Sequence, residues 1–224
     1  MAGLRSKQIK PYILLAVLGL LFFLPYLGRV DLFDWDELNF AECSREMLAT
    51  GDYLTVRVDY KPFHEKPPLF FWMQSASMAT FGTNEFAARL PNALVGIATL
   101  LVIFGIGRRH FDERFGLLWA LAYLGSFLPH FYFKTGLIDP TFNLFMYLSC
   151  YWLSRYSSAI QQGAPGRRKL MAAAVFASLA VMTKGPVGFG LPAIAWAIFL
   201  LRYGRTGRFA LKDFVAYAAV SFAP

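Results

Sequence analysis

One polar stretch, from Asp34 to Pro68, separates two apolar segments and sets the plan of the whole chain. It begins Asp34-Trp35-Asp36-Glu37 and ends His64-Glu65-Lys66-Pro67-Pro68. Acids, a histidine and a lysine gather here, whereas most of the remaining sequence is apolar. A polar stretch of this length between apolar segments indicates a long loop outside a membrane, held by helices that lie within it.

The composition supports a membrane protein. Of the 224 residues, 57% are hydrophobic and only 16% are charged, compared with about 25% charged residues in an average chain. A soluble core would not need several nearly uncharged runs of about 20 residues, the length that crosses a bilayer. The two cysteines, Cys43 and Cys150, fall in a polar and an apolar setting, which disfavours a disulfide framework.

The apolar runs predict the membrane-spanning segments. The first covers residues 11–28, after a basic start, and resembles a signal peptide. We favour an uncleaved span because the run is longer than a signal core and no small-residue cleavage site follows. The later spans are expected at 86–107, 115–133, 140–155, 170–183 and 186–201, with another starting near 214. Because the sequence ends inside that last run, we expect a longer parent protein.

The first loop, residues 29–83, has predicted structure of its own. Asp34 and Glu37 have the spacing of a capping box, and Gly51 is a helix stop, so we expect a helix over 36–49. Residues 54–61 alternate in polarity, which predicts an extended segment. The apolar run 69–81 reaches only about 20 Å as a helix, too short for the bilayer core, and predicts an interfacial helix. The fold class is therefore an all-α integral membrane protein, a multi-span helical bundle with a long extracytoplasmic first loop that contains interfacial helices.

The basic residues test this topology. With the N-terminus inside, 14 of the 22 lysines and arginines lie on the cytoplasmic side, as the positive-inside rule requires. The net charge of +8 is thus explained by topology, and a nucleic-acid partner is not expected. These basic residues are Arg5, Lys7, Lys10, Arg108, Arg109, Arg114, Arg155, Arg167, Arg168, Lys169, Arg202, Arg205, Arg208 and Lys212.

Three acids are catalytic candidates. Asp36 and Glu37 either favour the start of a helix through its dipole or supply a general base or metal ligand above the membrane. Asp139 precedes Pro140 and has the sequence of an ordinary helix start, but the topology puts it on the same outer face as Asp36. Acids beside apolar spans tend to be functional because charge near lipid is unfavourable.

Several basic and metal-ligating side chains can likewise be interpreted as structural or as functional. Lys66 and Lys184 lie at span ends, where they either snorkel to the interface or bind a phosphate. His64 and Glu65 are adjacent and could bind a divalent metal, although two neighbouring residues are a weak metal signal. His130 is expected to be a packed interfacial residue.

An ordered set of short motifs resembles the N-terminal part of lipid-linked sugar transferases with the glycosyltransferase-C fold, in the aminoarabinose transferase and protein O-mannosyltransferase superfamily. The motifs extend over most of the chain. They are Asp36-Glu37, Gly51-Asp52-Tyr53-Leu54-Thr55, Lys61-Pro62, Glu65-Lys66-Pro67-Pro68-Leu69, Arg89-Leu90-Pro91, Asp139-Pro140 and Thr183-Lys184-Gly185-Pro186.

The resemblance implies roles for several residues. Asp36 would be the leading catalytic acid, Lys66 would contact the donor phosphate, and Asp139 would line the cavity, while Glu65 is the candidate metal ligand. Aminoarabinose transferases have an arginine three residues after the aspartate of the acidic pair, and here Asn39 occupies that position. The substrate-binding candidates are Lys66, Lys184, His64 and Asn39.

The expected function is a membrane glycosyltransferase that moves a sugar from a polyprenyl-phosphate donor to a lipid A-like glycolipid, a glycan or a protein. The reaction would take place on the extracytoplasmic face of a bacterial inner membrane. No cofactor is required, and a divalent metal is left open. Two alternatives of other classes are a transporter or lipid flippase without transferase activity, which would place polar groups near the bilayer midplane, and a structural subunit without an acidic site.

Overall fold

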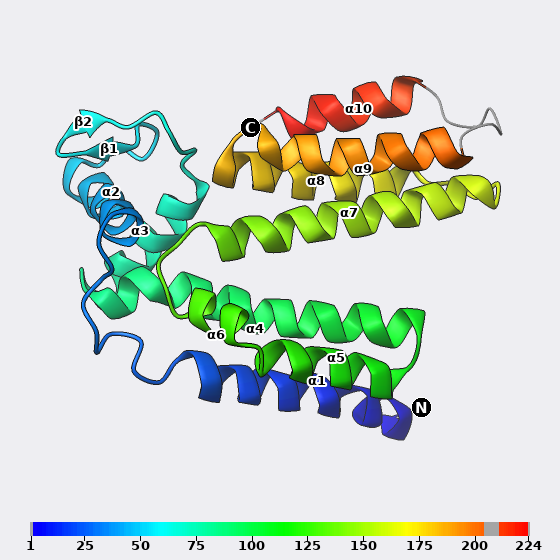
Figure 1. The fold of residues 1–224 in the computed structure, drawn as a ribbon, viewed down its shortest axis with the longest axis horizontal. Coiled ribbons are helices and arrows are strands. Elements are labelled where there is room, and N and C mark those ends of the chain that lie inside the picture. The colour runs from blue at the N-terminus through cyan, green and yellow to red at the C-terminus, as the bar shows by residue number, and fades with distance from the viewer. Residues whose placement is uncertain (1, 204–210, 224) are drawn as a thin grey trace. The chain divides into compact units, whose positions relative to one another are not determined.

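The computed structural model describes residues 2–203 and 211–223. It divides into two compact units, Met1–Pro62 with Phe71–Pro140, and Phe63–Phe70 with Thr141–Pro224. Most of the described chain is helical (Figure 1). Two of the expected cytoplasmic basic residues, Arg205 and Arg208, lie outside the described residues.

The first unit is built around helix α4 (Glu85–His110). Helices α1 (Ala2–Phe23) and α5 (Glu113–Leu124) pack on it, and α6 (Phe127–Phe133) covers its middle. Leu15, Ile103, Phe104 and Ala120 form an apolar core between these helices. Within the described residues, α4 is the one helix both long and apolar enough to cross a membrane, and Ile9–Phe23 and Val187–Ile198 are shorter apolar helices.

The prediction of one continuous helix over 115–133 is wrong. Helix α5 ends at Leu124, Ser126 is extended with φ −77° and ψ 137°, and α6 begins at Phe127. Pro129 explains the break, because it has no N–H to bond the carbonyl of Gly125 and its ring would clash with that carbonyl. The first helix also differs from the expected 11–28, since α1 ends at Phe23 and a turn follows.

The helix expected over 36–49 is confirmed as α2 (Asp36–Thr50), which ends at Gly51 with φ 71°. The capping box is wrong. Trp35, not Asp34, precedes the first helical residue, and the Glu37 carboxylate accepts from the backbone N–H of Phe33 at 2.8 Å. The helix expected over 69–81 is α3 (Leu69–Phe81). One of its faces packs on α2, where the Ser44 hydroxyl donates to the Gln74 side chain at 2.8 Å.

The extended segment expected over 54–61 is only partly present. Strands β1 (Arg57–Val58) and β2 (Lys61–Pro62) form a two-residue antiparallel hairpin. Upstream of it, the Asp52 carboxylate accepts from the N–H groups of Leu54 and Thr55, which curls residues 52–55 into a turn. The Thr55 N–H, and then the Arg57 guanidinium at 2.7 Å, hold the pKa of Asp52 well below its usual range.

Most of the second unit consists of four helices, α7 (Asp139–Gln161), α8 (Arg167–Lys184), α9 (Val187–Tyr203) and α10 (Leu211–Ser221). Helix α8 packs against α9 and α10. Their shared core contains Tyr156, Trp196 and Tyr217 together with small alanines of α8. Helix α7 begins in the first unit, at Asp139 and Pro140, and the rest of it belongs to the second unit.

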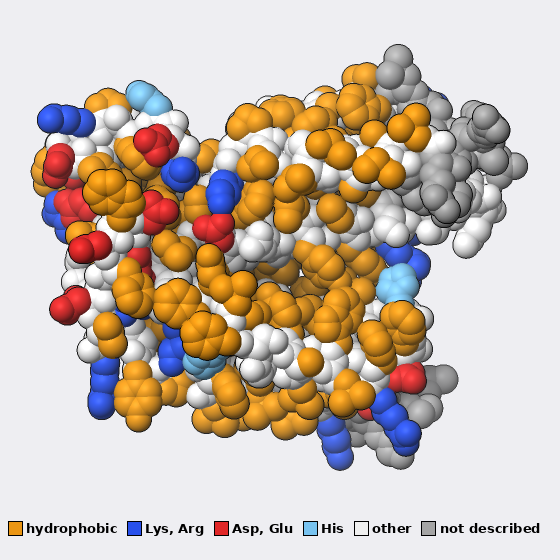
Figure 2. Space-filling view, viewed as in Figure 1, with side chains coloured by type: hydrophobic (Ala, Val, Ile, Leu, Met, Phe, Trp, Pro, Cys, Tyr) orange, Lys and Arg blue, Asp and Glu red, His pale blue; other side chains and the backbone are white. Residues whose placement is uncertain are grey.

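Polar and apolar surfaces are separated along the chain. Figure 2 shows hydrophobic side chains over α9 and α10, and acids and bases gathered over α2 and the β1–β2 hairpin. Large apolar side chains on several helices are exposed, among them Leu21, Leu118 and Ile198. Exposed apolar surface of this extent is characteristic of contact with lipid or with further protein.

Candidate functional site

Asp36 is exposed at the first residue of α2. The preceding residue, Trp35, has φ 74° and ψ −105° and is 81% exposed. Positive φ is unfavourable for a bulky side chain, and strained backbone of this kind tends to occur at functional sites. The sequence prediction that Asp36 can meet a substrate is compatible with its exposure. Asn39, one turn further along α2, is half-buried.

Glu37 is buried, whereas the catalytic role predicted for it requires a carboxylate that a substrate can reach. It is 1% exposed, and its carboxylate accepts four hydrogen bonds. Two come from Arg89, at 2.8 Å to Oε1 and 2.9 Å to Oε2. The backbone N–H groups of Phe33 and Gly136 donate the others. A carboxylate whose two oxygens are occupied in this way has no site left for a substrate proton, and the geometry favours a structural task for Glu37.

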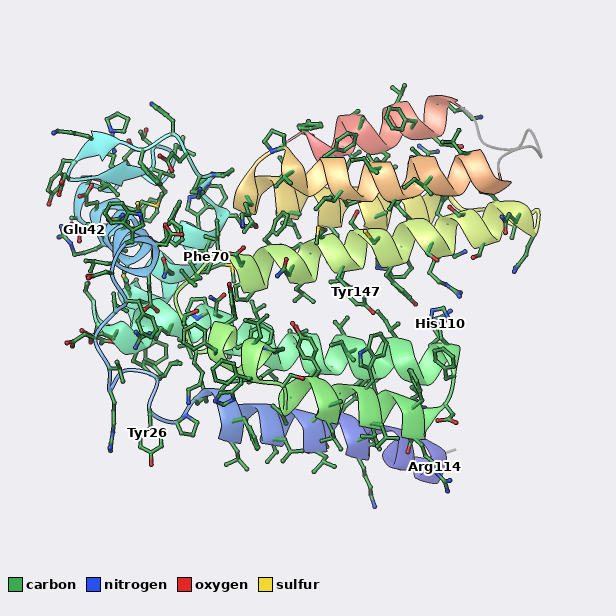
Figure 3. The ribbon with its side chains drawn as sticks, viewed as in Figure 1. Tyr26, Glu42, Phe70, His110, Arg114 and Tyr147 are labelled. Atoms are coloured by element: carbon green, nitrogen blue, oxygen red, sulfur yellow. The ribbon has the colours of Figure 1, made fainter. Side chains whose placement is uncertain are left out.

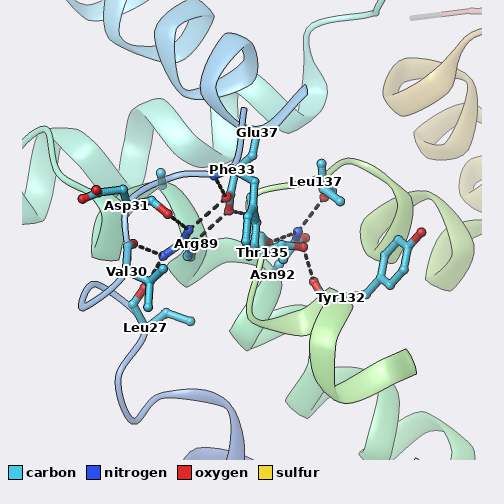
Figure 4. Close-up of polar contacts among 12 residues, drawn as sticks. Leu27, Val30, Asp31, Phe33, Glu37, Arg89, Asn92, Tyr132, Thr135 and Leu137 are labelled. Carbon is cyan, nitrogen blue, oxygen red and sulfur yellow. Dashed lines mark hydrogen bonds and ion pairs between the residues drawn. The ribbon is translucent and has the colours of Figure 1, made fainter. Parts of the chain in front are cut away.

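Arg89 is equally saturated. Its guanidinium has five N–H donors, and beyond the two bonds to Glu37 it donates to the carbonyls of Leu27 at 3.0 Å, Val30 at 2.7 Å and Asp31 at 2.9 Å. Figure 4 shows these bonds joining α4 to the segment that follows α1. The side chain is 3% exposed. Arg89 belongs to the motif Arg89-Leu90-Pro91, from which no role for its side chain was predicted, although an arginine inside an apolar helix is itself a signal of a buried partner.

Asn92 lies about one turn after Arg89 on α4 and is fully buried. Its side-chain amide donates to the carbonyls of Thr135 and Leu137 (Figure 4). Gly136, between those two residues, donates to Glu37. The three residues just before Ile138 and Asp139 are therefore bonded in succession to side chains of α2 and α4. Asp139 itself is half-buried at the first residue of α7.

The other candidates belong to the second unit. Lys66 is half-buried, and its Nζ lies 3.9 Å from Oε2 of the exposed Glu65. Lys184 is the last residue of α8, with its Nζ 5.5 Å from the ring centroid of Phe142, a cation–π contact. His64 is exposed. Where the chain is described, no three histidine, cysteine or acidic side chains gather in a group that could hold a metal ion.

A cavity of about 280 Å³ opens in the first unit beside Arg89. Aromatic side chains of α6 and of the segment after α1 form part of its wall, and His130 and Lys134 contribute polar groups. The Lys134 ammonium donates to the carbonyl of Pro25 at 2.8 Å. His130 contacts Phe22 and Phe23, with ring centroids 6.2 Å apart in each pair, which confirms that its side chain is packed.

Solved structures share this fold. The chain is similar to ArnT from Cupriavidus metallidurans, in crystal structures of the apo state and of the protein bound to undecaprenyl phosphate. Each comparison has a TM-score of 0.81 and 27% sequence identity, and covers 95% of this chain and 40% of the other.

Curated relatives of similar sequence include aminoarabinose transferases. The chain is 32% identical over 204 residues to an undecaprenyl phosphate-alpha-4-amino-4-deoxy-L-arabinose arabinosyl transferase of Edwardsiella ictaluri, covering 88% of this chain and 36% of the relative. It is 30% identical over 224 residues to a second such transferase of Pseudomonas fluorescens, covering 97% of this chain and 39% of the relative. The chain thus spans somewhat over a third of the length of these relatives.

Residues 65–223 match the family described as dolichyl-phosphate-mannose-protein mannosyltransferase. The matched region includes Lys66, Arg89, Asp139 and Lys184, and Asp36 precedes it. The match extends over more than half of the sequence, across both compact units. The chain belongs to the dolichyl-phosphate-mannose-protein mannosyltransferase family.

Proposed function

We propose that this chain is the N-terminal part of an integral-membrane glycosyltransferase that takes its sugar from a polyprenyl-phosphate donor. The family match supports the transfer of a lipid-linked sugar. The relatives described as aminoarabinose transferases, and the ArnT structure bound to undecaprenyl phosphate, support a polyprenyl carrier and a pentosyl group. The acceptor is a lipid A-like glycolipid, a glycan or a protein.

The membrane arrangement is part of the proposal. Several helices cross a bacterial inner membrane, with α4 as the longest apolar one. The first loop, residues 29–83, then lies on the periplasmic side, with the acids and bases of α2 and the hairpin. The exposed apolar side chains of α1, α5 and α9 support contact with lipid, and the basic residues at alternate connections support this orientation.

In the proposed reaction, an acceptor oxygen attacks the anomeric carbon of the sugar and the bond to the carrier phosphate breaks. Asp36 accepts the proton when the acceptor is a hydroxyl, and orients the acceptor when it is an already ionised phosphate. Lys66 stabilises the charge that develops on the departing lipid phosphate. Asp139 lies beside the sugar, and Lys184, His64 and Asn39 contribute to substrate binding.

The observation that carries the proposal is an exposed aspartate at the strained start of α2, in a chain of this family. The exposed side chain can reach a substrate, whereas its neighbour Glu37 is buried and saturated. Asp36 is therefore the acid on which the test should act.

The test uses the full-length protein in nanodiscs, with an undecaprenyl-phosphate-linked aminoarabinose donor and lipid A as acceptor. Asp36→Asn keeps the size of the side chain and removes its charge, so transfer should fall by about 10²–10⁴-fold, the contribution of a general base. Asp34→Asn is the matched control, because Asp34 is an exposed acid two residues away, and it should keep parental activity. Normal turnover of Asp36→Asn would remove Asp36 from the reaction, and vesicle experiments in which the protein moves the donor lipid across the bilayer without product would favour a flippase.

A further inference from the structure

The buried contacts around Glu37 join parts of the first unit that are distant in sequence. Glu37 and Arg89 are 52 residues apart, and Glu37 and Gly136 are 99 residues apart. Arg89 also bonds three carbonyls in the segment between α1 and α2. One bidentate ion pair therefore connects the start of α2, the segment before it, α4, and the segment before α7.

A buried ion pair is not needed for stability alone. Removing two charges from water is unfavourable, and apolar residues of similar volume often give equal or greater stability. What such a pair supplies is direction, since a planar guanidinium and a carboxylate fix both the distance and the orientation of the groups they join. Here every N–H of Arg89 and both oxygens of Glu37 point at specific partners.

Close packing at Gly136 adds a second constraint. A Cβ at this position would lie 3.2 Å from Cγ of Glu37 and 3.1 Å from Nε2 of Gln74. The backbone N–H of Gly136 can approach the Glu37 carboxylate because no side chain intervenes. On either side, Asn92 bonds the carbonyls of Thr135 and Leu137. The segment that ends at Asp139 is thus fixed from two helices at once.

The two candidate catalytic acids of the first unit, the exposed Asp36 and the half-buried Asp139, adjoin this network in the sequence. Asp36 is the residue before Glu37, and Asp139 is two residues after Leu137. Helix α4 carries Arg89 and Asn92 and is the common support of both segments. A change in the Arg89–Glu37 pair, or in the bonds that Asn92 makes to the segment before α7, would move one acid relative to the other.

We propose that Glu37, Arg89 and Asn92 are positioning residues that hold the backbone at Asp36 and the backbone before Asp139 in one fixed arrangement on α4. The proposal rests on the proposed function, in which both acids serve the same transfer reaction. Glu37 then exchanges no proton during turnover and acts through the placement of its neighbours.

Two variants of the full-length protein test the network. Glu37→Gln keeps the shape of the side chain but leaves Arg89 opposite an amide. Asn92→Asp is isosteric and replaces an amide donor by an anion that faces two carbonyls. Because a displacement of about 1 Å can lower a rate by about 10²-fold, we expect kcat to fall about 10–100-fold in both. Donor KM should stay near the parental value.

The matched control is Glu42→Gln. Glu42 is on the same helix as Glu37 (Figure 3), but its ion pair with Arg45 is at the surface, with side chains 33% and 37% exposed. A surface pair within one helix contributes little, so this variant should keep parental kcat and stability. The double variant Glu37→Gln with Arg89→Gln removes both charges, and its kcat should stay low because amides cannot restore the bonds to the three carbonyls.

Hydrogen exchange gives a readout that needs no substrate. In Glu37→Gln and Asn92→Asp, the amides of residues 134–138 should exchange faster than in the parent, and the pH profile of kcat/KM should keep its shape. Unchanged exchange, or faster exchange with parental kcat, would refute the positioning role. Loss of one limb of the pH profile in Glu37→Gln alone, with unchanged exchange, would make Glu37 a proton-transfer group. If the parent transfers no sugar, the proposed function fails, and exchange still decides whether the network holds the segment.

Discussion

Two adjacent acids, Asp36 and Glu37, have opposite environments. Successive residues of a helix point about 100° apart, so one faces outward when the next faces the core. Asp36 is exposed, whereas Glu37 is buried against α4 and bonded to Arg89. The difference between a candidate catalytic acid and a structural one is thus a single step along α2.

At the residue scale, Lys66 provides a test of the phosphate site. In the full-length protein, Lys66→Ala should weaken binding of the undecaprenyl-phosphate donor about 10–150-fold, the effect of losing a charge-assisted contact worth about 1.5–3 kcal/mol. Lys66→Arg should retain part of the affinity, because the positive charge remains. Donor affinity and turnover of both variants in the same nanodisc preparation provide the measurement.

Lys61→Ala serves as the control for Lys66. Lys61 is an exposed lysine five residues away, in strand β2. Its loss should leave donor affinity nearly unchanged. If Lys66→Ala binds and turns over donor like the parent, Lys66 is a snorkelling side chain, and Lys184 becomes the next candidate.

At the scale of elements, α4 and α5 approach each other through glycines. A Cβ on Gly116 would lie 2.7 Å from the carbonyl oxygen of Phe104 and 2.9 Å from the backbone N of Arg108. A Cβ on Gly107 would lie 2.8 Å from Cα of Gly116. Backbone atoms cannot rotate away as side chains do, so small residues are needed at this crossing, as is common in membrane helix pairs.

Gly116→Ala should therefore push α5 away from α4 and destabilise the protein by about 1–3 kcal/mol, the range for overpacking. Thermal unfolding of the full-length protein in detergent measures the effect. Gly190→Ala is the matched control, because a Cβ there meets no atom within 4 Å and alanine is the better helix former. Equal melting temperatures for the two variants would contradict the close crossing.

At the scale of the whole molecule, the proposed orientation places the first loop outside and the α7–α8 connection inside. Cys43 and Cys150 are first replaced by alanine, and a cysteine is then introduced at Leu54 or at Gln162, both exposed. In intact cells, a membrane-impermeant maleimide should label the protein with cysteine at 54. It should label the one with cysteine at 162 only after the cells are opened. The reverse pattern would overturn the proposed site as well as the topology.

Much of the secondary structure was predictable from local patterns. Apolar runs predicted most of the helices, although the run 115–133 is divided into α5 and α6. Gly51 predicted the end of α2 because glycine readily adopts positive φ. The ordered motifs predicted the family. These features depend on residues that are close in sequence. Pro129 could have predicted the break between α5 and α6, but the hydrophobicity of the run concealed it.

The contacts of Glu37, Arg89 and Asn92 were decided by tertiary structure alone. Their partners are distant in sequence. Many of these partners are backbone carbonyls and N–H groups, whose involvement cannot be recognised from the residue type. An acidic pair at a helix start has the same pattern whether its second member faces a substrate or a buried arginine. Only the packing of α2 on α4 brings Arg89 to Glu37. Because both side chains are buried there, leaving either charge unpaired would be strongly unfavourable, and the contact is therefore specific.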